Sequence, residues 1–157
     1  MKGLFSTSHS IQNFDLVILV VRISIAGLML SHGLPKMALL FTDGPIQFPG
    51  LLGMSPELSL GLAVFAEVIC SLFILVGFST RLATIPLIVT MLVALVFVHG
   101  SDPFAKQELA WHYLLGYGLL FITGGSKYSI DYLLEKKSLN VNYSKVKTGD
   151  PTVRMYY

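Results

Sequence analysis

The sequence predicts an all-α membrane protein that crosses the bilayer several times as a four-helix bundle. Three observations support this class. Hydrophobic residues make up 54% of the 157 residues, and the mean hydropathy is +0.70. Charged residues account for only 13%, compared with about 25% in soluble domains. The apolar residues fall in runs close to the roughly 20 residues that a spanning helix needs.

The order of these runs predicts one membrane domain, residues 15–134, between two polar ends. An N-terminal arm covers residues 1–14, and a polar C-terminal tail covers residues 138–157. A short amphipathic helix at about residues 129–137 would lie along the lipid headgroups. The spanning helices are expected at residues 16–35, 58–78, 82–98 and 109–125.

The first helix has polar residues at both ends. Asp15 precedes the apolar run, where its carboxylate would cap the helix and favour the positive end of the helix dipole. Pro35 lacks an amide donor and disfavours continuation of the helix. If the helix nevertheless runs on, His32 and Lys36 lie one turn apart on one face. The Gly- and Pro-rich segment that follows, residues 42–56, is expected to be a loop at the interface or over the bundle.

The fourth run, residues 109–125, is near the lower limit of length for a span. Trp111, Tyr113 and Tyr117 are residue types typical of the membrane surface, and Gly124-Gly125 is a C-terminal stop signal. We therefore expect this helix to complete the bundle.

The distribution of basic residues predicts the orientation. Four crossings would put both termini on one side, together with Arg81, Lys127 and most of the other lysines. The opposite loops hold only Lys36 and Lys106. Because positively charged segments stay in the cytoplasm, we expect cytoplasmic N- and C-termini. The net charge of +2, without a basic cluster, argues against nucleic acid as a partner.

The candidate polar site centres on Glu67, which interrupts the second apolar run. A charge in hydrocarbon costs about 2.5–3.5 kcal/mol for Asp, Lys or Arg, so such a group normally faces protein or water. Two interpretations are open. Glu67 and Arg22 form an ion pair that fixes helix packing, or Glu67 lies in a polar cavity where histidines carry protons or hold a ligand. The candidate residues are Arg22, His32, Lys36, Glu67, Arg81, His99 and His112.

No metal site is predicted from these residues. His32, His99 and His112 come from different helices and form no HxxH or HxxxH pair. Cys70, the single cysteine, excludes an intramolecular disulfide and is interpreted as a packing residue.

Several motifs occur in a fixed order along the chain. They are Arg22, His32-Gly33-x-x-Lys36, Glu67, Gly77-Phe78-x-x-Arg81-Leu82-Ala83, His99 and Gly124-Gly125-x-x-Tyr128-Ser129-x-Asp131. In this order they resemble the DoxX family and its DoxD-like relatives, over approximately residues 15–134. The resemblance implies a four-helix protein of the bacterial cytoplasmic (inner) membrane. The family-like polar positions are Arg22, His32, Lys36, Glu67, Arg81 and His99.

The resemblance implies an accessory or anchoring subunit of a membrane redox system, linked to quinone or sulfur, or of an oxidative-stress system. Independent enzyme activity and a cofactor of its own are not predicted, although a quinone or other small molecule would fit near Glu67. The expected partners are the lipid bilayer, a redox protein and further copies of the chain. Two alternatives are open: a quinone-reducing oxidoreductase component in which Glu67 and His32 handle protons, and a small oligomeric proton-coupled transporter.

Overall fold

The protein was examined as a computed structural model that describes residues 11–147, with side chains described for residues 13–140. All regular elements in this range are helical, which confirms the all-α part of the predicted class. Most of the predicted N-terminal arm and residues 148–157 of the predicted tail lie outside the described range. The elements are α1 (Ile11–Leu39), α2 (Pro56–Val64), the π-helical segment η1 (Phe65–Cys70), α3 (Ser71–Val76), α4 (Thr80–Val93), the π-helical segment η2 (Ala94–Val98), α5 (Phe104–Thr123) and α6 (Ile130–Lys147).

Three helices between residues 11 and 147 are long and apolar enough to cross a membrane. They are Asn13–Leu39 of α1, the continuous helix Pro56–Val76 formed by α2, η1 and α3, and Thr80–Val98 formed by α4 and η2. These match the first three predicted spans. Helix α5 has the required length of 20 residues but is not among them. Its first half carries Lys106, Gln107, Glu108 and His112, which lower its hydropathy.

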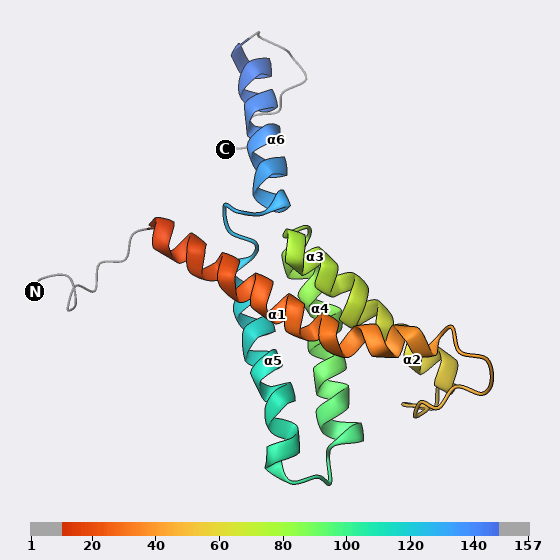
Figure 1. Ribbon diagram of the computed structural model, residues 1–157. Coiled ribbons are helices and arrows are strands. Elements are labelled where there is room, and N and C mark those ends of the chain that lie inside the picture. Colours follow the sequence, from red (N-terminus) through yellow and green to blue (C-terminus); the bar gives the residue numbers. More distant parts are fainter. Residues whose placement is uncertain (1–10, 148–157) are drawn as a thin grey trace, which may run out of the picture.

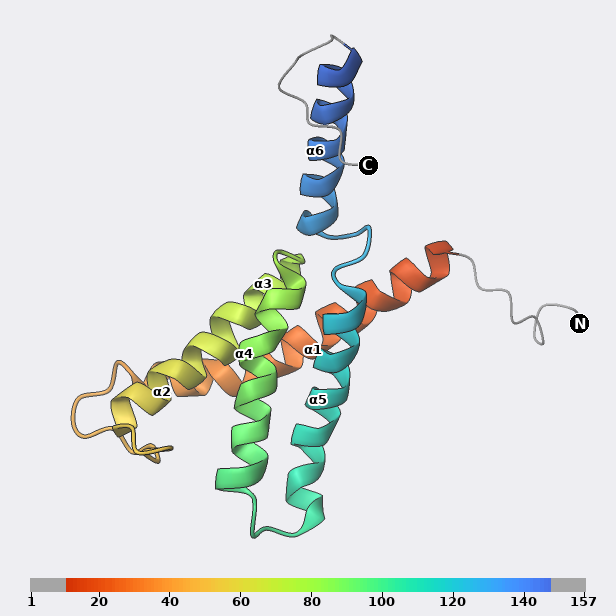
Figure 2. The same ribbon diagram turned by 180° about the vertical axis from the view of Figure 1, so that it is seen from behind.

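The helices pack around a shared apolar core. Helix α1 runs diagonally across the others (Figure 1). Seen from behind, α4 and α5 lie side by side and antiparallel, joined by a short loop (Figure 2). The core draws fully buried side chains from α1, α3, α4 and α5, including Ala26, Ile74, Leu87 and Leu120. Helix α6 extends away from this core beyond the end of α5 in both views.

A second, smaller cluster holds the loop after α1 against α2. Leu60, Val64 and Val68 are buried there, and Ile46 and Phe48 of the loop pack on them. Close by, Gly33 lets α1 approach η1, because an added Cβ would lie 3.0 Å from the Glu67 carbonyl carbon and 2.9 Å from Val68. This close crossing brings the C-terminal half of α1 against the turn that carries Glu67.

Helix α1 extends beyond its predicted limits at both ends. It is already helical at Ile11, so Asp15 lies inside the helix and the predicted cap at Asp15 is wrong. Its carboxylate instead accepts the Lys127 amide at 3.3 Å. At the other end α1 continues through Pro35 to Leu39. Proline removes one amide donor, but the packing of this half of α1 on η1 and α2 stabilises the helix beyond it.

Asp131 ties the turn between α3 and α4 to the start of α6. Gly77 and Ser79 both have positive φ, 72° and 47°, so the chain reverses within three residues. The Asp131 carboxylate accepts the amides of Ser79 at 2.6 Å and Thr80 at 2.9 Å, and its own amide donates to the Gly77 carbonyl at 2.9 Å. Asp131 therefore caps α4 from a distant part of the chain.

Helix α6 runs from Ile130 to Lys147, past the expected end at residue 137. No glycine or proline occurs between residues 130 and 147, so nothing in the local sequence ends the helix there. Residues 138–147 of the predicted tail are thus helical.

We expect Asp131→Ala to destabilise the fold by about 1–2 kcal/mol, because two amides at the start of α4 lose their acceptor. Thermal unfolding of the purified protein in mild detergent measures the loss. Asp43→Ala, in the exposed loop after α1, is the matched control and should leave the unfolding temperature unchanged. Equal unfolding temperatures for the two variants would contradict the capping role.

Candidate functional site

Glu67 lies in a buried ion pair inside the protein. Its side chain is 2% exposed and projects from the π-helical segment η1. Lys36 Nζ donates to Glu67 Oε1 at 2.5 Å, and the lysine side chain is 33% exposed. Lys36 reaches this position because α1 continues beyond Pro35. A π-helical turn widens the helix locally, and such turns are frequent at functional sites.

The second carboxylate oxygen of Glu67 is unpaired. Oε2 is buried and has no hydrogen-bond partner among the described residues. The hydroxyls of Ser71 and Tyr117 are likewise buried and unpaired in this part of the chain. A buried acceptor without a donor is costly, about 1–3 kcal/mol for a neutral group and more for a charged one. The interior beside Lys36 therefore contains unused hydrogen-bonding capacity.

Two cavities meet at the Lys36–Glu67 pair. The larger, about 210 Å³, has mostly apolar walls from the loop after α1, from α2 and from α4, including Phe48, Leu62 and Val89. The smaller, about 160 Å³, is lined by His32, His99 and Tyr113 together with Lys106. Lys36 and Glu67 line both cavities. One ion pair thus faces an apolar chamber and a chamber with titratable groups.

Aromatic rings form one wall of the smaller cavity. His32 meets Tyr113 edge to face with ring centroids 6.0 Å apart, and Tyr113 stacks on Tyr117 at 5.8 Å. Such arrangements fix ring positions and favour a single geometry. The tyrosines, interpreted from sequence as surface or packing residues, are buried.

His99 follows η2 and is held by Asp102. The distance from Nδ1 to the Asp102 carboxylate is 2.8 Å, and Lys106 lies 3.4 Å from the same carboxylate. The hydrogen bond from His99, with a smaller contribution from Lys106, holds the pKa of the Asp102 carboxyl below its usual range. Because an ionised carboxylate only accepts, Nδ1 carries the proton and Nε2 is the nitrogen left for exchange.

Arg22 does not pair with Glu67. Its side chain is 2% exposed, and its guanidinium donates to the carbonyls of Gly125 and Tyr128, both at 2.7 Å. Arg22 and Lys36 are separated by about 21 Å along α1, at 1.5 Å per residue. Gly77 leaves room for the guanidinium, because an added Cβ there would collide with it. The Arg22–Glu67 interpretation is therefore wrong, and Lys36 is the partner that sequence spacing did not identify.

The other candidates separate into two places. Arg81 donates to the Ile122 carbonyl at 3.1 Å, at the Arg22 end of the protein. His112 bonds the Glu108 carbonyl through Nδ1 at 2.8 Å and lines an apolar groove of about 360 Å³ between α1 and α5. Three residues, His32, Leu109 and Tyr113, line that groove as well as the smaller cavity, so they form the boundary between the two.

The sequence interpretation missed the roles of Asp131 and Asp15 at the Arg22 end. The signal for Asp131 was present in the Tyr128-Ser129-x-Asp131 motif, but its target, the start of α4, is set by tertiary structure alone. In the region with described side chains, no group of three or more His, Cys, Asp or Glu residues is arranged to hold a metal. Cys70 is buried and unpaired with any other cysteine.

We expect Lys36→Met and Glu67→Gln to be coupled in unfolding free energy by about 1–3 kcal/mol, since each single change leaves the other group of a buried pair uncompensated. Arg22→Gln and Glu67→Gln should instead be additive within about 0.5 kcal/mol, because they share no partner. Two double-mutant cycles measured by unfolding in detergent test both statements. Additivity for Lys36 and Glu67 would rule out a stabilising pair.

Comparison with known proteins finds a family match over the part of the chain that contains the Lys36–Glu67 pair. The DoxX family model matches residues 17–100, which covers most of α1 and all of α2, η1, α3, α4 and η2. The match includes Arg22, His32, Lys36, Glu67, Arg81 and His99, and it ends before α5. No curated protein and no solved structure matches the chain. The chain belongs to the DoxX family of proteins.

Proposed function

We propose that this protein is an accessory or anchoring subunit of a bacterial inner-membrane redox system, linked to quinone or sulfur, or of an oxidative-stress system. In this role it binds a quinone-type small molecule at the Lys36–Glu67 pair. The observation that carries the proposal is Glu67, which is buried, held by Lys36 through one oxygen and unpaired at the other. Family membership supports the membrane setting.

The chemistry of the site suits a ligand with an apolar ring and polar oxygens. The cavity of about 210 Å³ has apolar walls, and an engineered apolar cavity of about 150 Å³ is large enough for benzene. A Lys36 ammonium would donate to a quinone carbonyl, and Glu67 Oε2 would accept from a hydroquinone hydroxyl. The rest of the ring would lie against Phe48 and Leu62.

The second candidate function is a quinone-reducing oxidoreductase component. It is favoured by His32 and His99, which line the smaller cavity together with Glu67. Histidine is the side chain that most often acts as a general acid or base. A carboxylate and two histidines around one cavity would relay protons between a bound quinone and the membrane surface.

We further propose that α5 is the fourth crossing and that both termini are cytoplasmic. Helix α5 is antiparallel to α4 over its length, and 20 helical residues extend about 30 Å. Arg81 and Lys127 would then lie on the cytoplasmic side with the lysines of α6, and Lys106 on the opposite side.

The quinone proposal predicts that protein purified in mild detergent and incubated with decylubiquinone retains it. Lys36→Met should lower retention of decylubiquinone, and Glu67→Gln should lower retention of its hydroquinone form, each at least tenfold, because each change removes a charge-assisted hydrogen bond of about 1.5–3 kcal/mol. Quantification of extracted quinone by mass spectrometry, relative to protein, provides the measurement.

Glu108→Gln is the control for this experiment, because it makes the same change on the exposed face of α5. It should bind like the unchanged protein. Absence of quinone from the unchanged protein, or equal retention by all variants, would contradict the proposal. Reduction of decylubiquinone by the purified chain alone would favour the oxidoreductase component over the accessory subunit.

The topology predicts opposite labelling of two single cysteines in a Cys70→Ser background. In intact spheroplasts, a membrane-impermeant maleimide should label Ser101→Cys, in the loop between η2 and α5, but not Ser138→Cys on α6. The second site should react only after the membrane is permeabilised. Labelling of both sites from the same side would show that α5 does not cross.

A further inference from the structure

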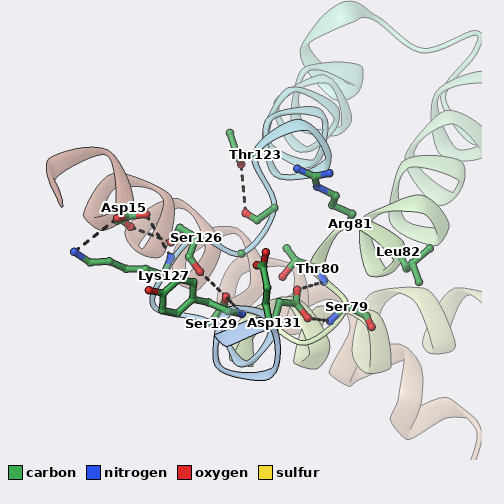
Figure 3. A pocket seen from close by; sticks show the side chains of 14 residues that line it. Asp15, Ser79, Thr80, Arg81, Leu82, Thr123, Ser126, Lys127, Ser129 and Asp131 are labelled. Carbon is green, nitrogen blue, oxygen red and sulfur yellow. Dashed lines mark hydrogen bonds and ion pairs between the residues drawn. The ribbon is translucent and has the colours of Figure 1, made fainter. Parts of the chain in front are cut away.

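A polar pocket of about 760 Å³ lies at the end of the protein opposite the Lys36–Glu67 pair. Its walls come from the start of α4, the end of α5, the segment that links α5 to α6, and the first turns of α6 (Figure 3). The spans Pro56–Val76 and Thr80–Val98 end and begin beside it. The pocket therefore lies where these helices meet the membrane surface.

The start of α4 supplies anion-binding groups to this pocket. A helix leaves its first amides without intrahelical acceptors, and Asp131 takes only those of Ser79 and Thr80. The amides of Arg81 and Leu82 come next in the same turn, and both residues line the pocket. Helix N-termini with free amides bind phosphate groups readily.

A buried hydroxyl provides independent support for a ligand. Thr80 is 0% exposed and lines the pocket, and its Oγ1 has no hydrogen-bond partner among the residues with described side chains. The hydroxyl lies against the α5–α6 linker, since a Cβ added at Gly125 would come within 2.8 Å of Oγ1. An unpaired hydroxyl at this position is suited to a ligand oxygen.

Three carboxylates and two cations line the pocket, and most of them already have partners. Lys127 and Asp15 face each other at 3.7 Å, and the Asp131 carboxylate is occupied by two amides. Within residues 13–140, Arg81 is the cation and Glu135 the carboxylate that line the pocket without taking part in an ion pair or capping a helix. A lining with one cation and one carboxylate left over complements a zwitterion better than an anion.

The surroundings also accommodate a lipid chain. Leu82 lines the pocket and is 68% exposed, and Tyr132 on α6 is half-exposed beside it. These side chains provide an apolar path from the pocket toward the bilayer. A headgroup held at Arg81 would place its acyl chains along Leu82 and the outer face of α4.

We infer that this pocket binds a phosphoethanolamine ester, with the phosphate at Arg81 and the start of α4 and the ammonium at Glu135. Phosphatidylethanolamine in the membrane and soluble glycerophosphoethanolamine share this chemistry. The site is separate from the Lys36–Glu67 pair and does not depend on the function proposed for that pair.

The test uses the full chain, delipidated in mild detergent and titrated with dioleoyl phosphatidylethanolamine or dioleoyl phosphatidylglycerol, with bound lipid counted by native mass spectrometry. The phosphatidylethanolamine should bind at least tenfold more tightly. Arg81→Gln and Glu135→Gln should each reduce this preference several-fold. Glu108→Gln, on the exposed start of α5, is the matched control and should leave it unchanged.

Charge reversal keeps the test decisive if an Arg81 variant fails to fold. Glu135 is exposed on α6, so Glu135→Lys should fold and should shift the preference toward phosphatidylglycerol. Equal or tighter binding of phosphatidylglycerol by the unchanged protein, or an unchanged preference in both Glu135 variants, would overturn the inference. Glycerophosphoethanolamine binding as tightly as the lipid would identify a soluble ester as the ligand, whereas binding of the lipid alone would identify the membrane lipid.

Discussion

The structure depends on the high cost of an unpaired charge inside a membrane protein. Two ionisable side chains lie 2% exposed in the spanning helices, and each is paired differently. Arg22 directs its guanidinium at two neutral carbonyls, which pair its two terminal nitrogens without cancelling the charge and leave Nε without a partner among the described residues. Glu67 pairs with the Lys36 ammonium through one oxygen and keeps the other. The Arg22 contacts join α1 to the α5–α6 linker. The Glu67 pair instead lies at two cavities and leaves an acceptor for a ligand.

The path of α1 connects these two arrangements. Helix α1 crosses the other helices diagonally (Figure 1) and carries both Arg22 and Lys36. Arg22 bonds the α5–α6 linker, and Lys36 bonds Glu67 of η1. Gly33 permits the close approach at η1, and Gly77 leaves space for the Arg22 guanidinium. A side chain at Gly33 would push α1 away from η1, and a side chain at Gly77 would displace the Arg22 guanidinium. The fold therefore relies on two small residues to bring charged groups to their partners.

Hydropathy in the sequence was sufficient to predict the helical class and the first three spans, because burial in lipid requires long apolar helices whatever their packing. Spacing also identified Glu67 and Lys36 as unusual polar positions. Spacing could not show that these two residues pair. Lys36 reaches Glu67 only because α1 continues past Pro35, and tertiary contacts stabilise that part of the helix. Nor could spacing predict η1, whose composition is that of an ordinary helix, or Asp131, which caps a helix some 50 residues away in the sequence. Local pattern determines the elements, and long-range contacts determine their partners.

The hydrogen bonds of Arg22 join residues separated by 103 and 106 positions in the chain. Ribosomes add about 5–20 residues per second, so the acceptors for this arginine are made roughly 5–20 s after the arginine itself. During that time the first helix carries a cation whose hydrogen-bond acceptors, the carbonyls of Gly125 and Tyr128, come only in the segment after α5. Insertion into the bilayer can thus begin with α1, but α1 acquires its final surroundings last. A chain cut before Gly125 would lose a C-terminal segment and, with it, the completed environment of its first helix.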